Sequence, residues 1–228
     1  MNHTDDKEDP LGSEEKQRIL EERLNVLTHG IGVVLSIVAL IFLVSFSLLN
    51  GGYKSLAGSV VFGISLVTLY MASSLYHSCK KPKAKETFQI IDHSAIYVLI
   101  AGSYTPYALL VLEGRTGWAL LGIVWGLAIL GILFKSFFVE KMKILSTLAY
   151  VFMGWIAIFV YRQLAESLPL PGMVLLFAGG ISYTLGAIFF GIRRMPLNHA
   201  VFHLFVLGGS ICHFLSIYLY VLPLGIGR

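Results

Sequence analysis

The chain has 228 residues, of which 56% are hydrophobic and only 13% are charged, and its mean hydropathy is +0.77. These values exclude an ordinary water-soluble domain and are typical of a protein that crosses a membrane several times. The formal net charge of +4 does not indicate nucleic-acid binding, because the basic residues lie in scattered short connections; anionic membrane lipids are the expected partner.

The first 24 residues are polar and contain eight of the thirteen acidic residues. A secretory signal peptide begins with a short basic stretch and ends in small residues, whereas this segment runs directly into an apolar stretch of full spanning length. We therefore expect residues 1–24 to form an uncleaved cytoplasmic tail. Residues 25–228 are expected to form a single transmembrane domain.

Seven later stretches are apolar enough to cross the bilayer, for which a helix needs about 20 residues. In chain order they cover residues 26–49, 55–77, 92–112, 117–134, 144–161, 172–190 and 199–222. The connections are short and contain the glycine and proline residues that interrupt helices. The sequence therefore predicts an all-α integral membrane bundle of seven transmembrane helices.

The distribution of basic residues predicts the orientation of the bundle. Nine basic residues belong to the connections after spans two, four and six, namely Lys80, Lys81, Lys83, Lys85, Lys135, Lys141, Lys143, Arg193 and Arg194. The opposite side has four, which are Lys54, Arg115, Arg162 and Arg228. Because short connections rich in lysine and arginine stay in the cytoplasm, we expect a cytoplasmic N-terminus and an extracytoplasmic C-terminus.

Glycines in three spans are expected to let helices approach closely. They are Gly122 and Gly126 in span four, Gly179 and Gly180 in span six, and Gly208 and Gly209 in span seven.

Ionisable side chains are costly inside a membrane and usually mark function. Six of the seven histidines lie in a span or at its edge. Of the five acids after the tail, Asp92 alone opens onto an apolar run, whereas Glu86, Glu113, Glu140 and Glu166 are assigned to connections.

Three of these histidines are placed to bind one metal ion. His199 and His203 are four residues apart, so they share one face of a helix. His77 ends span two at a similar depth in the cytoplasmic half of the membrane. Three imidazoles with an open fourth position are the ligand set of a catalytic zinc ion, although the alternative for any single histidine is a hydrogen bond between helices.

Two further side chains are expected beside this site. Ser73 lies one turn before His77 on the same helix face, and Asp92 lies at matching depth on the next helix. A carboxylate and a hydroxyl can orient metal ligands or a bound water. The alternatives are a helix N-cap for Asp92 and a bond to the carbonyl four residues back for Ser73.

The remaining histidines are expected to have other roles. His29 is either a further outer partner of the site or an interfacial residue. His93 points about 100° away from Asp92 around the helix, which favours packing or a polar network, although it too is a candidate outer partner. His213 lies too deep to share the metal and is expected to hydrogen-bond between helices.

At these residues the sequence resembles the hemolysin III proteins, the bacterial branch of the progestin and adipoQ receptor family. The similarity rests on Ser73-x-x-x-His77, on "DHSAIY" and "GSYTP" in span three, and on "NHAVFH" followed by His213. The resemblance implies a seven-helix bundle with its N-terminus inside, a zinc ion bound by His77, His199 and His203, and Asp92 nearby through water. Animal members resemble intramembrane ceramidases and hormone receptors, and the bacterial branch is linked to haemolysis and membrane-lipid homeostasis; the short tail and small outer loops of this chain differ from the receptors.

The leading functional expectation is a zinc-dependent hydrolase, or hydrolase-like protein, of the bacterial cytoplasmic membrane that acts on a lipid amide or ester. Asp92 and Ser73 are the expected catalytic residues, and no organic cofactor is expected. Two alternatives remain open at this point: a non-enzymatic membrane sensor stabilised by zinc, and a cytolytic pore. The substrate, the protein partners and the oligomeric state do not follow from the sequence.

Overall fold

The computed structural model describes residues 10–112, 114–138, 143–192 and 194–226. Within these ranges the chain is helical almost throughout and forms no β-strand. Seven helical segments of the described chain are long and apolar enough to cross a membrane. The predicted all-α, multi-pass membrane fold is therefore confirmed.

In the described part of the chain, the seven spans contain eight α-helices, because one span is divided. The first four spans are α1 (Pro10–Asn50), α2 (Tyr53–Ser78), α3 (Pro82–Tyr107) with the π-helical turn η1 (Ala108–Leu112), and α4 (Gly114–Phe138). The fifth consists of α5 (Lys143–Gly154), the 3₁₀ segment η2 (Trp155–Val160) and α6 (Tyr161–Ser167). The last two are α7 (Leu170–Gly191) and α8 (Asn198–Ser216), the latter extended by η3 (Ile217–Val221) and η4 (Leu222–Gly225).

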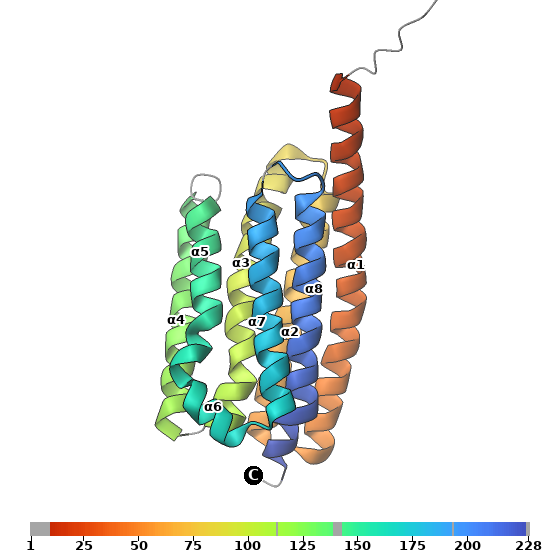
Figure 1. Ribbon diagram of the computed structural model, residues 1–228. Coiled ribbons are helices and arrows are strands. Elements are labelled where there is room, and N and C mark those ends of the chain that lie inside the picture. The colour runs from red at the N-terminus through yellow and green to blue at the C-terminus, as the bar shows by residue number, and fades with distance from the viewer. Residues whose placement is uncertain (1–9, 113, 139–142, 193, 227–228) are drawn as a thin grey trace, which may run out of the picture.

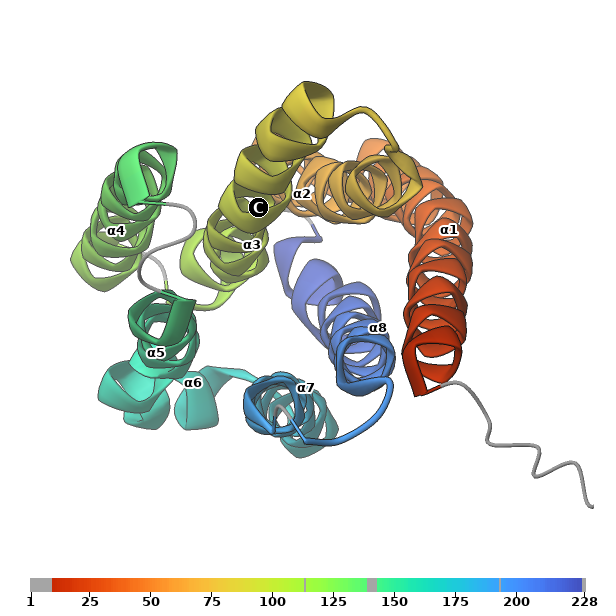
Figure 2. The same cartoon turned by 90° about the horizontal axis from the view of Figure 1, so that it is seen from above.

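The spans stand side by side and follow one another around the bundle in sequence order (Figures 1 and 2). Contacts between α1 and α8 close the arrangement, so the first and last helices are neighbours. The start of α1 and the end of η4 lie at opposite ends of the bundle (Figure 1), as an odd number of spans requires. Which end faces the cytoplasm remains a prediction from the basic residues.

The surface and the interior are arranged as a lipid solvent requires. Large apolar side chains are exposed around the bundle, for example Trp118 and Leu130 on α4 and Phe152 on α5. The interior in turn holds many hydroxyl groups that hydrogen-bond between helices, such as Ser47 with Ser59 at 2.7 Å. Polar groups inside a membrane need such partners because lipid provides none.

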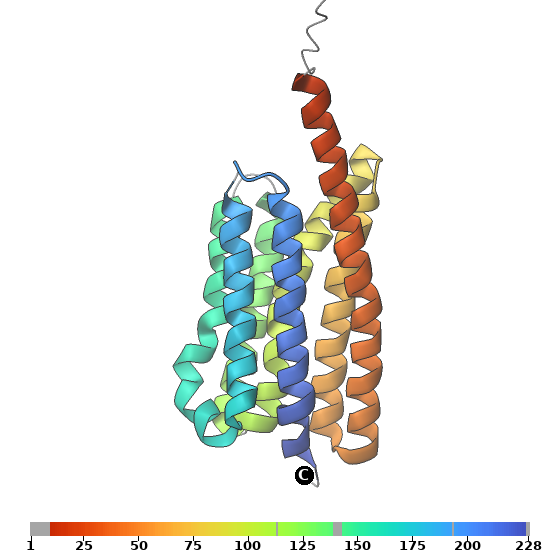
Figure 3. The same ribbon diagram turned by 45° about the vertical axis from the view of Figure 1, so that its right-hand side comes forward.

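Helices α1 and α3 begin well before the apolar stretches that predicted them. Figure 3 shows α1 continuing beyond the ends of its neighbours. Residues 10–24, which were expected as part of the tail, belong to this helix. Their Glu, Lys, Gln and Arg residues favour helix as strongly as leucine does, and Pro82 suits the first turn of α3. Hydropathy marks the apolar part of a helix and not the residue at which the helix begins.

Several residues assigned to connections lie in helices instead, among them Lys83 and Lys85 in α3. Lys135 is 2% exposed near the end of α4, and Glu86 and Glu166 occupy exposed positions of α3 and α6. The predictions for Glu113, Glu140, Lys141, Arg193 and Arg228 fall outside the described residues.

The division of the fifth span has an identifiable cause. The Tyr104 hydroxyl donates to the Gly154 carbonyl at 2.6 Å and accepts from the Ala157 backbone N–H at 2.9 Å. It thereby occupies two groups of the helical ladder, and the chain continues as η2 between α5 and α6.

The glycines divide into packed and open positions. A Cβ on Gly179 would meet the His213 ring and the Gly209 carbonyl oxygen, and one on Gly209 would meet the Tyr183 ring at 2.7 Å. These two glycines therefore permit the close packing of α7 on α8, as predicted. The expectation for Gly122 and Gly126 is wrong, because a Cβ at either position meets nothing within 4 Å.

We expect Gly179→Ala to destabilise the protein by about 1–3 kcal/mol, the usual cost of overpacking a close contact. The added methyl would press on the His213 ring and approach the Gly209 carbonyl oxygen to 3.1 Å. The midpoint of thermal unfolding in detergent measures the effect. Gly122→Ala on the open face of α4 is the matched control, and equal midpoints for the two variants would contradict the packing argument.

Candidate metal centre

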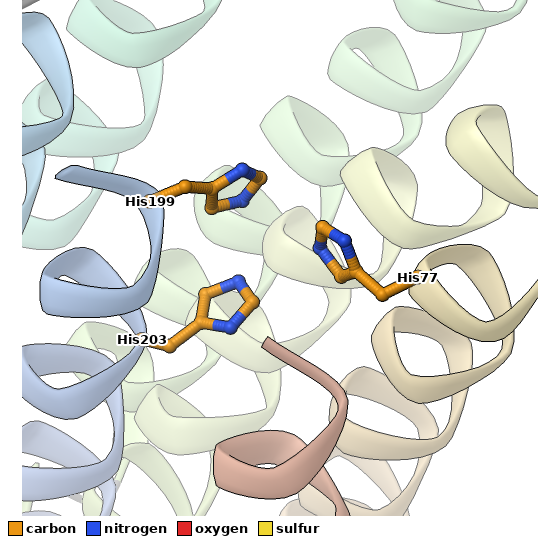
Figure 4. A group of neighbouring side chains, drawn as sticks. All are labelled: His77, His199 and His203. Carbon is orange, nitrogen blue, oxygen red and sulfur yellow. The ribbon is translucent and has the colours of Figure 1, made fainter. Parts of the chain in front are cut away.

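Three histidine rings converge at one end of the bundle. His77 lies in the last turn of α2, and His199 and His203 lie in the first turns of α8 (Figure 4). The ring centroids are 4.8 Å apart for His77 and His199, 5.2 Å for His77 and His203, and 4.6 Å for His199 and His203. Helical spacing brings the two α8 rings together, and helix packing adds the third.

The three side chains fit a metal ion. Each offers one ligand nitrogen, and these nitrogens all lie within 4.8 Å of one another. Nitrogens bound to one zinc ion at about 2.1 Å lie about 3.4 Å apart, so small side-chain rotations suffice. The buried His77 Nε2 atom has no hydrogen-bond partner in the described part of the chain. A buried nitrogen without a partner is costly, and its lone pair is suited to bind a metal ion.

Helix α1 supplies partners to all three histidines. Glu22 Oε2 accepts a hydrogen bond from His77 Nδ1 at 2.6 Å. Thr28 Oγ1 lies 3.4 Å from His203 Nδ1, and Glu21 Oε1 accepts from the backbone N–H of His199 at 3.2 Å. In both side-chain contacts the hydrogen bond occupies Nδ1 and leaves Nε2 for a metal, which is the usual arrangement of metal-binding histidines.

These α1 residues were missed by the sequence interpretation, which placed Glu22 in the polar tail. A signal was present: Glu22, Asn25 and His29 are spaced i, i+3 and i+7, which puts three polar groups on one helix face. That face enters the bundle, where Asn25 is 2% and His29 is 3% exposed.

The two expected catalytic residues lie beside the cluster. Asp92 is 7% exposed on α3, and Ser73 is 1% exposed on α2. Asp92 interacts electrostatically with His77 and lies next to Ser73, although the Ser73 Oγ atom completes no well-formed hydrogen bond among the described residues. Asp92 is not one of the side chains whose ligand atoms lie within 4.8 Å. It is thus a neighbour of the three imidazoles and not a member of their group.

The three other described histidines have different surroundings. The His29 ring stacks on His203 with centroids 3.5 Å apart, and neither of its nitrogens has a partner within the described ranges. His93 lines the same cavity as Asp92 and accepts a hydrogen bond at its backbone oxygen from the Tyr150 hydroxyl. His213 Nε2 lies 3.2 Å from the Leu176 carbonyl oxygen on α7, which confirms the predicted interhelical hydrogen bond.

A cavity of about 360 Å³ begins at the histidine cluster and runs along the inside of the bundle. His199, His203, Asp92 and Ser73 line it near the cluster, and His213 lines its deeper part. His199 and His213 are separated by about four helical turns, or roughly 21 Å. Between them the walls are largely apolar, with leucine, isoleucine and phenylalanine side chains from α3, α7 and α8.

Known proteins resemble this chain over most of its length. The sequence profile described as "Haemolysin-III related" matches residues 17–214. The chain is 50% identical over 207 residues to the Hemolysin-3 of Bacillus cereus, which covers 91% of this chain and 94% of the relative. It is 48% identical over 202 residues to the Hemolysin-3 homolog of Bacillus subtilis (89% and 95%).

A more distant relative is the human "Monocyte to macrophage differentiation factor". It is 28% identical to this chain over 220 residues, and the aligned region covers 93% of this chain and 89% of the relative. The profile match extends from α1 almost to the end of α8 and includes every histidine of the cluster. The chain is therefore a multi-pass membrane protein of the haemolysin-III family.

Proposed function

We propose that the protein is a zinc-dependent hydrolase that acts on a lipid amide or ester within the membrane. The observation that carries this proposal is a cluster of three imidazoles beside a long, largely apolar cavity, one end of which is lined by His199, His203 and the buried carboxylate of Asp92. A structural metal site would need no such cavity. The proposed hydrolysis would release a fatty acid inside the membrane, and this product would connect the protein to membrane-lipid homeostasis.

His77, His199 and His203 would hold the ion, and an imidazole set favours zinc over the oxygen-seeking cations. A zinc ion in such a site lowers the pKa of water and polarises a carbonyl group. Proton transfer and stabilisation of the developing negative charge are then assigned to the side chains around the ion.

Asp92 is positioned to act as the general base. Its carboxylate lines the cavity next to the cluster, where it would take a proton from the attacking water as the new bond to the carbonyl carbon forms. The proton would then pass to the departing amine or alcohol as the original C–N or C–O bond breaks. Ser73 would donate its hydroxyl hydrogen to the carbonyl oxygen, on which negative charge develops.

The cavity supports a lipid as the substrate. Its apolar walls run deep into the bundle from the cluster, so an acyl chain would lie along them with its carbonyl group beside Asp92. The same walls exclude bulk water from the reacting atoms.

A non-enzymatic sensor is the second candidate. The cluster joins α2 to α8 and contacts α1, so an ion bound there would hold the ends of three helices together. This candidate predicts metal-dependent stability without lipid turnover. A cytolytic pore has less support, because the buried acid Asp92 and every described histidine except His213 lie at one end of the bundle, so the described residues form no continuous ionisable stripe through it.

Replacing a metal ligand tests the site that both candidates share. We expect His77→Ala and His203→Ala to reduce the zinc content of the purified protein from about one ion per chain to nearly none, since three ligands are needed. Metal analysis measures the content. His213→Ala, which removes another buried histidine of α8, should retain zinc; full zinc occupancy in His77→Ala would show that the ion is bound elsewhere.

Asp92→Asn separates the hydrolase from the sensor. We expect it to lower the hydrolysis of lipid amides or esters by roughly 10²–10⁴-fold, the usual contribution of a general base, while the zinc content stays unchanged. Release of fatty acid from a panel of lipid substrates in detergent measures the rate. Glu166→Gln, at an exposed carboxylate on α6, is the control. Wild-type rates in Asp92→Asn would refute the mechanism, and a zinc-loaded wild type without turnover would favour the sensor.

A further inference from the structure

The Glu22 carboxylate on α1 uses both of its oxygens at the histidine cluster. Oε2 lies 2.6 Å from His77 Nδ1, and Oε1 lies 2.8 Å from the Lys85 Nζ atom on α3. The side chain of His77 is only 2% exposed, whereas those of Glu22 and Lys85 are 37% and 35% exposed. One carboxylate thus connects a buried ring of α2 with a half-exposed lysine of α3.

The contact with Glu22 determines which nitrogen of His77 carries the proton. An ionised carboxylate can only accept hydrogen bonds, so Nδ1 must donate to it. The neutral ring then has its lone pair on Nε2, the buried atom that lacks a partner among the described residues. The Asn25 amide nitrogen also lies 3.4 Å from Nδ1, but the shorter, charge-assisted contact with Glu22 is the stronger of the two.

Lys85 fixes the carboxylate in turn. Its ammonium group lies 5.2 Å from the centre of the Tyr76 ring, so it contacts α2 as well as α1. Glu22 therefore forms an ion pair with Lys85 through one oxygen and a hydrogen bond with His77 through the other. Rotation of the His77 ring away from the other two histidines would therefore break the contact with Glu22.

We infer that Glu22 is a positioning residue for the metal centre: it sets the tautomer and orientation of His77 and thereby the metal affinity, and Lys85 supports it. This inference rests on the proposed metal site but not on hydrolysis. Glu22 does not bind the ion. It acts on a ligand, as outer carboxylates do when they orient a metal-binding histidine, where their loss typically weakens binding 10–100-fold.

The experiment measures zinc affinity in the purified full-length protein without lipid, by competition with a chromophoric chelator. Glu22→Ala removes the acceptor and should weaken zinc binding about 10–100-fold. Glu22→Gln keeps a carbonyl oxygen that can accept from Nδ1 but loses the charge, so it should recover much of the affinity. Lys85→Met leaves the acceptor in place and should have the smallest effect of the three.

A spectroscopic readout separates positioning from a general loss of stability. With cobalt in place of zinc, the visible absorption of wild type reports the ligand set, and Glu22→Ala should alter it whereas Glu22→Gln should restore it. Glu15→Ala, at an exposed carboxylate of the same helix that pairs with Arg18 at 3.8 Å, is the matched control and should resemble wild type.

The outcomes are distinct. Wild-type affinity in Glu22→Ala, or equal losses in the Ala and Gln variants, would overturn the positioning role while leaving the metal site intact. A wild-type protein that binds no zinc would overturn the metal site itself, and the positioning role with it. Tight zinc binding without lipid turnover would overturn only the hydrolase proposal.

Discussion

A polar group inside a membrane must find its partner within the protein, and this constraint shapes the whole molecule. Lipid offers no hydrogen bonds, so each unsatisfied group costs several kcal/mol. Many interior hydroxyls meet the requirement by donating to a carbonyl of their own helix, as Ser65 does to Phe62 at 2.7 Å, or by pairing between helices, as Tyr107 does with Ser216 at 2.7 Å. The rings of His29 and His77 retain unpartnered nitrogens within the described chain, and both lie at the same cluster. Unpartnered polar atoms also occur elsewhere in the described interior, for example at Ser55 and at His213 Nδ1. At the cluster, however, they lie beside ring nitrogens that could hold one metal ion.

The sequence predicted those parts of the structure that depend on local pattern. Seven spans follow from the length of apolar stretches, and the pairing of His199 with His203 follows from helical periodicity. That His77 would join them required only that α2 and α8 be close at the same depth, and the structure confirms it. Matching depth is a strong guide in a membrane because all spans share the same two surfaces.

What the sequence interpretation missed depends on helix packing or on the end of a helix. Glu22 was assigned to the tail because hydropathy marks the hydrocarbon layer and not the helix end. The motif of Gly122 and Gly126 suggested a helix contact, yet these residues face outward, since the same spacing also occurs by chance in apolar sequence. Lys135 was placed in a connection, but its helix continues past the apolar stretch and buries it. Each error arises because local sequence composition does not determine where a helix ends or which of its faces contacts a neighbouring helix.

Two carboxylates near one histidine cluster have different surroundings, and this difference separates their tasks. Glu22 accepts from His77 and pairs with Lys85, so both of its oxygens are engaged on the side of α1. Asp92 lines the cavity from α3, and no ion pair with lysine or arginine involves it among the described residues. A carboxylate held by two cationic or donor groups is suited to orienting a ligand. One that faces an apolar cavity is suited to exchanging a proton with whatever enters it.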